Sequence, residues 1–199
     1  MFRRPFYTYT PDITTTPFID PVEIDTVEKT AGHIANLDLH IDASGRAHVL
    51  YLKRPIQHEF MRDKYFPGQP KTRYLEYMVL RDGKVVRHRT LAETSSDAKG
   101  VVPTYGRFHA AANGDLYVIV AGIEPTGSGS SAFGNFIGRI GPGADPPALA
   151  RLEMKHPFRS FFTNTPRGGS QPSDTIDLFG ISDDDPKLRY ARVRLAGRQ

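Results

Sequence analysis

The sequence predicts an all-β protein, and three observations favour this class. A hairpin pattern occurs twice, at 39–52 and again 69 residues later at 108–121. Each copy holds an apolar strand, a tight two-residue turn at Ser44-Gly45 or Asn113-Gly114, and a second strand of β-branched and aromatic residues. Further strand-length apolar stretches follow each hairpin, and the 18 glycines and 16 prolines fall mainly between the strands. No amphipathic helix of useful length is predicted.

The strands fall into units of similar order. The first unit, at 32–92, has strands predicted at 36–42, 46–53, 74–80 and 84–89, with an Asp82-Gly83 turn before the last. The second, at 103–155, repeats this order at 107–112, 115–121, 135–140 and 148–154. The third, at 158–196, has strands at 160–165, 175–181 and 188–195, and residues 1–31 are interpreted as the end of a preceding blade.

Four antiparallel strands that recur every several tens of residues are typical of a propeller blade. We therefore predict a partial β-propeller of about three four-stranded antiparallel blades in one segment, 1–199. A closed ring has ~4 to 8 blades, so a second copy or further blades would be needed to complete it.

Composition narrows the class of protein. With 39 % hydrophobic and 24 % charged residues, the chain resembles an ordinary soluble protein, and no apolar run reaches the ~18 residues of a membrane helix. The N-terminal residues lack the apolar core of a signal peptide. The absence of cysteine excludes disulfides and thiolate metal sites. The net charge of +4 is dispersed, which permits a polyanionic partner but does not indicate a nucleic-acid reader.

Two long connections indicate where ligands would bind. The links predicted at 54–71 and 122–134 would emerge, with the links between blades, on one face of a propeller. Long loops on a rigid scaffold commonly carry binding chemistry. We therefore expect the site on this loop-rich face.

Six short stretches lie within residues 32–195 and share features of one known family: Tyr105–Phe108, Asn113–Tyr117, Gly127–Ser130, Pro166–Ser173, Ile176–Leu178 and Arg189–Ala191. They resemble the BNR-repeat-containing, sialidase-like propellers, and the resemblance covers roughly residues 32–195. The strict Asp-box of that family, Ser-x-Asp-x-Gly-x-x-Trp, is absent, and the chain has no Trp.

The resemblance implies a carbohydrate-active propeller, either a sialidase-type hydrolase or a polysaccharide lyase of the ulvan-lyase type. Such lyases use His, Tyr and Arg at the mouth of the propeller. His33 fits the first histidine position of that pattern, whereas Lys53 and Arg54 occupy the second. A sialidase would need an arginine triad and a Tyr nucleophile with a Glu partner; Tyr105 is a candidate, but no Glu is convincing.

Four residues are predicted to be catalytic: His33, His58, Tyr105 and Arg107. A lyase acting on a uronic-acid polymer must neutralise the carboxylate, remove the C5 proton and protonate the leaving oxygen. Arg107 or Arg54 would neutralise, His33 or His58 would be the base, and Tyr105 would be base or acid. In the structural alternative, Tyr105 fills a blade interface, Arg107 pairs with a carbonyl or carboxylate, and the histidines are ordinary loop residues.

Substrate binding is predicted at Arg54, Arg167, Ser128 and Ser130. The glycines beside Arg167 would expose N–H groups to an anion, although a structural closure role is favoured for that segment. His40, His48 and His109 alternate along strands and are interpreted as structural. No spacing typical of a metal site occurs, and neither a metal nor another cofactor is expected.

The function predicted from sequence is action on an anionic polysaccharide, as a lyase or a glycoside hydrolase. The alternative is a non-catalytic carbohydrate-binding or interaction propeller, or an inactive fragment of a larger enzyme. The expected partner is an anionic glycan, with no nucleic acid and no membrane. His, Tyr and Arg side chains gathered within ~3 to 5 Å of a common point would favour catalysis. Scattered side chains would favour binding alone.

Overall fold

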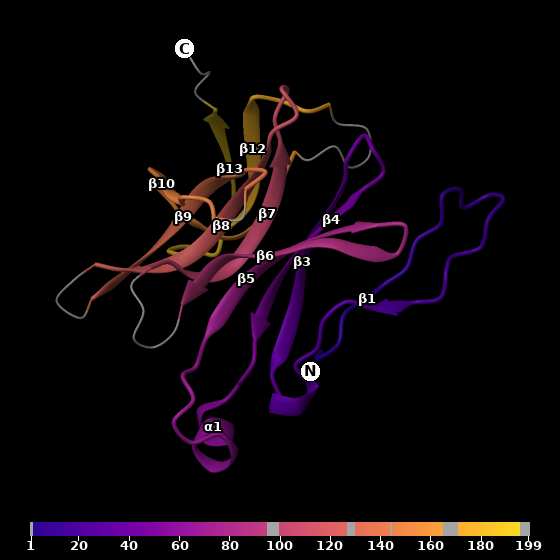
Figure 1. The fold of residues 1–199 in the computed structure, drawn as a ribbon. Coiled ribbons are helices and arrows are strands. Elements are labelled where there is room, and N and C mark those ends of the chain that lie inside the picture. Colours follow the sequence, from indigo (N-terminus) through magenta and orange to yellow (C-terminus); the bar gives the residue numbers. More distant parts are fainter. Residues whose placement is uncertain (1, 95–99, 127–129, 144, 165–170, 196–199) are drawn as a thin grey trace.

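The structure is a computed structural model that describes residues 2–94, 100–126, 130–143, 145–164 and 171–195. It confirms the all-β class, because the described residues form four antiparallel sheets of two to four strands and no closed barrel (Figure 1). Among the same residues, no helix is long and apolar enough to cross a membrane.

The first sheet has the strand order β3-β4-β5-β6. Its strands are β3 (His33–Ile41), β4 (Ala47–Arg54), β5 (Arg73–Arg81) and β6 (Lys84–Thr94). Each strand pairs antiparallel with the next one in the chain. Between β4 and β5 lies a short helix, α1 (Glu59–Tyr65), which the sequence analysis did not predict because its seven residues are too few to show an amphipathic period.

The second sheet repeats this order as β7-β8-β9-β10. Its strands are β7 (Val102–Ala110), β8 (Leu116–Pro125), β9 (Ser131–Ile140) and the short β10 (Ala150–Leu152). The link predicted at 122–134 is wrong in extent, because β8 and β9 stay paired as far as Pro125 and Ser131. Of the two connections predicted to be long, the one at 54–71, which carries α1, is long in the structure.

The remaining strands form a three-stranded and a two-stranded sheet. The third sheet has the order β11-β12-β13, with β11 (Phe158–Thr163), β12 (Thr175–Ser182) and β13 (Leu188–Arg194). The N-terminal sheet pairs β1 (Phe6–Tyr7) with β2 (Val22–Glu23), and a 3-10 turn at Glu28–Thr30 leads into β3. The two short strands within residues 1–31 therefore pair with each other.

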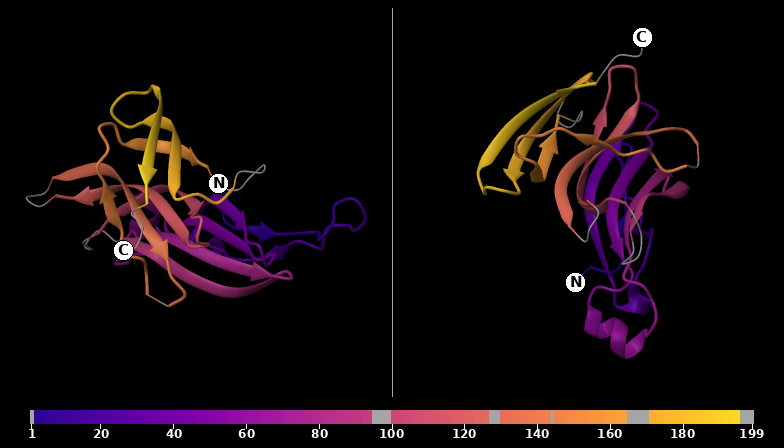
Figure 2. Two further views of the ribbon diagram at one scale, coloured as in Figure 1. Left: turned by 90° about the horizontal axis from the view of Figure 1, so that it is seen from above. Right: turned by 90° about the vertical axis from the view of Figure 1, so that its left-hand side faces the viewer.

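The sheets stack face to face in chain order, as Figure 2 shows. Leu50 and Tyr77 of the first sheet pack with Phe108 and Phe136 of the second. The other face of the second sheet packs on the third through a cluster that includes Phe161. Each interface is therefore an apolar layer, and the second sheet is covered on both faces.

The two repeated hairpins have the same turn geometry, but not the two-residue turn that the sequence predicts. The glycine is left-handed in each, with φ of 75° at Gly45 and 84° at Gly114, whereas Ser44 and Asn113 have ordinary negative φ. Each turn is closed by a bond from the glycine N–H to the carbonyl three residues earlier. This is the three-residue loop with a final left-handed glycine. The true two-residue turn is Asp82-Gly83, where both φ values are positive.

The first strands of the three sheets meet at the backbone of Phe108, on β7. Its N–H donates to Asp38 Oδ2 of β3 at 2.8 Å. Its carbonyl accepts from Thr163 Oγ1 of β11 at 2.6 Å. The leading edges of three successive sheets are therefore tied side by side.

Candidate functional site

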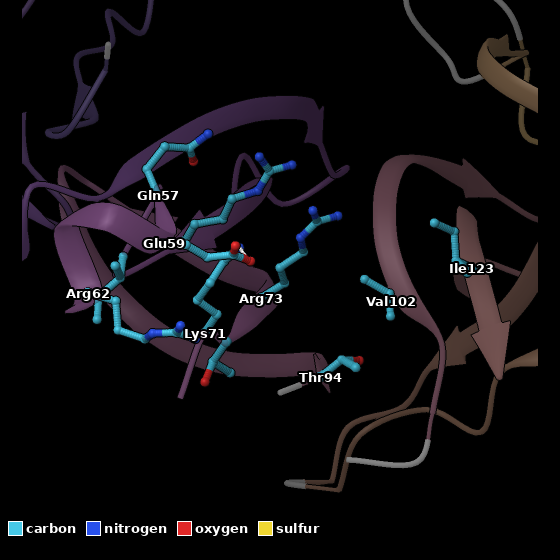
Figure 3. Close-up of a pocket in the computed structure, with 11 residues that line it drawn as sticks. Gln57, Glu59, Arg62, Lys71, Arg73, Thr94, Val102 and Ile123 are labelled. Carbon is cyan, nitrogen blue, oxygen red and sulfur yellow. Dashed lines mark hydrogen bonds and ion pairs between the residues drawn. The ribbon is translucent and has the colours of Figure 1, made fainter. Parts of the chain in front are cut away.

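A cavity of about 310 Å³ opens between the first and second sheets, beside the long α1 link. We call it the α1 cavity. Figure 3 shows Gln57, Glu59, Arg62 and Lys71 on one side of it, with Val102 and Ile123 of the second sheet across from them. It is the cavity that contains Arg54, one of the residues predicted to bind substrate; its other lining residues are Ile56, Thr72, Arg73 and Thr94.

Four of the lining side chains are cationic and one is acidic. Lys71 Nζ donates to Glu59 Oε1 at 2.8 Å, and Arg62 pairs with Asp63 just outside the cavity at 2.8 Å. Arg54 and Arg73 have no ion pair or side-chain hydrogen bond to any described residue. The α1 cavity therefore contains two guanidinium groups whose charge is not balanced within the described part of the chain.

The register of the first sheet brings these two arginines together. Arg54 is the last residue of β4 and Arg73 the first of β5, and the antiparallel β4–β5 pairing places these ends next to each other. Burial, and then the charge of Arg73, lower the pKa of Arg54 from its ordinary value. Its guanidinium remains protonated at neutral pH, because arginine loses its proton only at pH values far above 7. Two like charges are thus held together at a partly buried site, which an oxyanion would stabilise.

His33 does not line the α1 cavity. It lies opposite Arg54 in the β3–β4 register but lines a separate hollow with Phe2, Arg4 and Pro5. Burial, and then the charge of Arg54, lower the pKa of His33, so the imidazole is neutral at pH 7. Its Nδ1 is buried without a hydrogen-bond partner among the described residues.

Tyr105 and Arg107 contact each other and line neither the α1 cavity nor the hollow beside His33. Arg107 Nε donates to Tyr105 Oη at 2.9 Å, and Arg107 Nη1 lies 3.4 Å from the buried Asp38 Oδ1. The Tyr105 ring packs edge-on against Phe161 of the third sheet, with ring centres 5.3 Å apart. This is the arrangement that the structural alternative describes, with a tyrosine between sheets and an arginine on a carboxylate.

The other predicted residues do not join these. His58 is exposed, just before α1, and stacks on Phe60. Ser130 is exposed at the β8–β9 turn, where its Oγ lies 2.6 Å from Thr126 Oγ1. Arg167 and Ser128 lie outside the described residues. The described candidates therefore fall into separate places, and Arg54 alone of them lines the α1 cavity.

Sequence reasoning missed Arg73 and Lys71, the residues that make the α1 cavity cationic. Both lie at the end of the long link, where the sequence shows only basic residues in a polar stretch. Their position opposite Arg54 depends on the β4–β5 register, which an 18-residue link does not fix. Among the described residues, no group of three or more His, Asp or Glu side chains is arranged to hold a metal ion.

Comparisons with known proteins found no relative of this chain. No protein-family model matches the chain, and no match is found among curated proteins or solved structures.

Proposed function

We propose that this chain binds an anionic polysaccharide, and that the α1 cavity holds one acidic sugar unit of it. The observation that carries this proposal is the unbalanced pair Arg54 and Arg73 in a cavity open to solvent. A carboxylate or sulfate accepts two parallel N–H bonds from a guanidinium, and such charge-assisted bonds are stronger than neutral ones. An acidic sugar would therefore replace like-charge repulsion with attraction.

The rest of the α1 cavity suits a sugar ring. Its volume of about 310 Å³ is at the small end of the ~300–1,000 Å³ of ligand pockets, so it matches a single ring better than several. Ile56, Val102 and Ile123 offer apolar surface to the C–H groups of a ring. Gln57 and Thr94 offer hydrogen bonds to its hydroxyl groups.

We also propose that the three stacked sheets are consecutive blades of a partial sialidase-like propeller. Three features support this: the strand order follows the chain in each sheet, the hairpins have equivalent turns, and the leading strands meet at Phe108. Closure of a ring by a second copy remains a prediction, which sedimentation analysis of the mass in solution would test.

At the α1 cavity, binding without catalysis is favoured over a lyase or hydrolase activity. The predicted base His33, the predicted acid Tyr105 and the cation Arg54 line or contact different regions. General acid-base catalysis requires the reacting groups within hydrogen-bond reach of one substrate. Because His33 and Tyr105 do not line the α1 cavity beside Arg54, the arrangement supports a binding module.

The test is isothermal titration calorimetry with oligomers of polygalacturonate, alginate and a sulfated glycan, and with neutral dextran. We expect binding of at least one acidic oligomer and none of dextran. The double variant Arg54→Gln/Arg73→Gln should bind at least 10-fold more weakly, since each charge-assisted bond contributes about 1.5–3 kcal/mol. The control is Arg159→Gln, which removes an exposed arginine of the third sheet that does not line the α1 cavity.

Two results would count against the proposal. Equal affinity of the native chain and the double variant would exclude the α1 cavity as the binding site. Growth of ultraviolet absorbance from unsaturated products, or of new reducing ends, would show that the chain is a lyase or a hydrolase.

A further inference from the structure

A second cavity, of about 400 Å³, lies at the opposite end of the same interface. It is bordered by the turns of the two repeated hairpins, and we call it the hairpin cavity. One wall is a register row across the first sheet, formed by His40, His48, Val79 and Arg87. The facing wall comes from the second sheet and includes Asp115, Leu116, Arg139 and Ile140.

His48 is held by hydrogen bonds on both ring nitrogens. Its Nε2 lies 3.1 Å from Asp42 Oδ2 and its Nδ1 lies 2.7 Å from Tyr77 Oη. Because the carboxylate only accepts, Nε2 carries the proton and Nδ1 accepts from the Tyr77 hydroxyl. Tyr77 is itself buried and packs edge-on against Phe108. His48 is therefore a fixed part of the wall, as the sequence interpretation of a structural histidine expects.

His40 is different. Its ring centre is 5.6 Å from that of His48, yet no described residue forms a hydrogen bond with it. It is half-buried and lines the hairpin cavity. One imidazole of the row is thus fully bonded, and its neighbour is open to a ligand.

The arginines of the hairpin cavity also differ in whether they form an ion pair. Arg46 pairs with Asp42 at 2.7 Å, and Arg139 pairs with Asp115 at 2.6 Å. Arg87, by contrast, forms no ion pair with a described residue. It lines the hairpin cavity from β6, where it pairs with Val79 in the register row.

We propose that the hairpin cavity is a second binding site, for a single oxyanion group such as a sulfate, phosphate or carboxylate, held by Arg87 and His40. The two carboxylates in the lining are already bonded to Arg46 and Arg139, so they add little repulsion. In the register row, the bonded His48 and the apolar Val79 lie between His40 and Arg87. This site does not depend on the function proposed for the α1 cavity.

Binding at this site should strengthen as the pH falls. Burial, and then the charge of His48, lower the pKa of His40, while Asp42 raises it. An oxyanion beside His40 would favour the protonated imidazolium and so raise its pKa. The binding reaction therefore takes up a proton above the pKa of the free protein. The other charged groups that line the cavity are Arg46, Arg87, Asp115 and Arg139.

The experiment is a pH titration of the histidine ring signals by NMR, with and without sodium sulfate and at constant ionic strength. The His40→Gln variant identifies the His40 signal. We expect sulfate to raise the pKa of His40 in the native chain, and calorimetry to show several-fold tighter sulfate binding at pH 5.5 than at pH 7.5. Arg87→Gln should abolish both effects, whereas His40→Gln should keep weak binding that no longer depends on pH.

Controls separate this proposal from the first one. The Arg54→Gln/Arg73→Gln variant should keep the sulfate effect on His40, and Arg87→Gln should keep polysaccharide binding. The proposal is overturned if sulfate leaves the His40 titration unchanged, or if Arg87→Gln binds sulfate as the native chain does. An Arg87→Gln variant that is unfolded by circular dichroism would be replaced by Arg87→Lys, for which we expect weaker sulfate binding than in the native chain. Arg87→Lys affinity equal to the native value would also overturn the proposal.

Discussion

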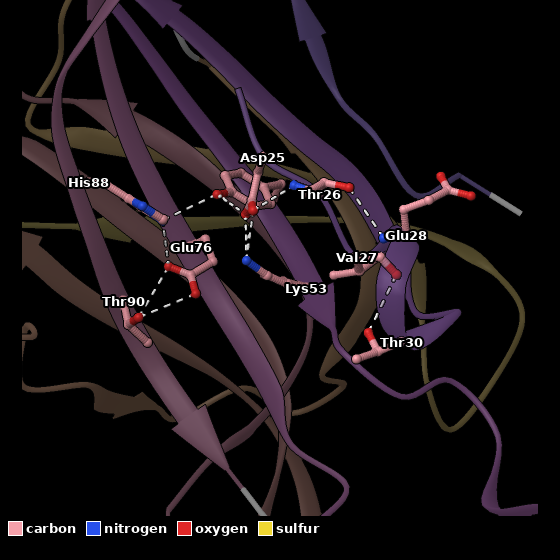
Figure 4. A network of polar contacts seen from close by, with 10 residues as sticks. Asp25, Thr26, Val27, Glu28, Thr30, Lys53, Glu76, His88 and Thr90 are labelled. Carbon is pink, nitrogen blue, oxygen red and sulfur yellow. Dashed lines mark hydrogen bonds and ion pairs between the residues drawn. The ribbon is translucent and has the colours of Figure 1, made fainter. Parts of the chain in front are cut away.

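The polar groups on the two faces of the first sheet differ in whether they have partners. On the face toward the N-terminal segment, Asp25 accepts from Tyr51 Oη at 2.8 Å and from Lys53 Nζ at 2.7 Å. The network continues on this face through His88 and Glu76, as Figure 4 shows. On the face toward the second sheet, an apolar centre separates two cavities, each with cations that no described residue balances.

This difference teaches how to assign a role to a buried charge. A charge whose partners are all present stabilises the fold, because removal of either partner leaves the other desolvated. A partly buried charge without a partner costs stability unless a ligand supplies one, and an exposed unpaired charge such as Arg87 adds nothing to the fold. We therefore assign Asp25 and its partners to folding, and Arg54, Arg73, His40 and Arg87 to binding.

The largest effect is expected from Asp25→Ala. The substitution leaves the Lys53 ammonium and the buried Tyr51 hydroxyl without their acceptor. We expect the free energy of unfolding to fall by about 2–4 kcal/mol, measured by urea denaturation. Asp20→Ala is the matched control, because Asp20 is exposed and has no ion pair with a described residue. Equal stability of the two variants would show that the network does not hold the N-terminal segment.

A smaller loss is expected from Arg107→Gln. This change removes the bond to Tyr105 and the contact with Asp38, although Asp38 keeps the N–H of Phe108. The free energy of unfolding should fall by about 1–2 kcal/mol in urea. Affinity for the acidic oligomer should stay at the native value. Loss of oligomer binding without loss of stability would instead indicate that Arg107 is part of the binding site.

His88 should give the paired face a distinct pH dependence. Its hydrogen bond to Glu76 raises its pKa above the usual 6.5. The stabilisation is therefore complete below pH 6.5 and is lost as the pH rises through the higher pKa of the folded state. Urea midpoints of the native chain and His88→Gln should differ most at acidic pH and converge at alkaline pH. The opposite trend would contradict the assigned bond.

The smallest effect on stability is expected at the α1 cavity. Removal of the like charges of Arg54 and Arg73 breaks no hydrogen bond to a described side chain. Arg54→Gln/Arg73→Gln should therefore change the free energy of unfolding by no more than about 0.5 kcal/mol, and the change should be stabilising. A loss of 2 kcal/mol or more would mean that the pair belongs to the fold.

The sequence predicted the strands better than it predicted the site. Local patterns are strong in the repeated hairpins, so their strands and the Asp82-Gly83 turn were expected at nearly the observed positions. Ser44-Gly45 and Asn113-Gly114 were assigned the wrong turn, because a Gly in the left-handed region fits both loop types. The extension of β8 to Pro125 was missed. The Gly and Ser residues at 127–130 indicate a turn, but they do not show where the β8–β9 pairing ends.

The site could be predicted only in part because its members come from different strands. Arg54 was identified from the long link, but its partner Arg73 is 19 residues away in the sequence and depends on the register. Arg87 and His40 lie on strands at the two edges of the first sheet. Whether such a residue has a partner is decided by the facing sheet, as Asp38 and Arg107 illustrate.

The most direct test of the division between paired and unbalanced charges measures stability and binding in the same two variants. Asp25→Ala should lose stability and, below its unfolding transition, bind the acidic oligomer as tightly as the native chain. Arg54→Gln/Arg73→Gln should keep its stability and bind at least 10-fold more weakly. If instead both variants lose stability and neither loses affinity, the unbalanced arginines are not a binding site, and the division is contradicted.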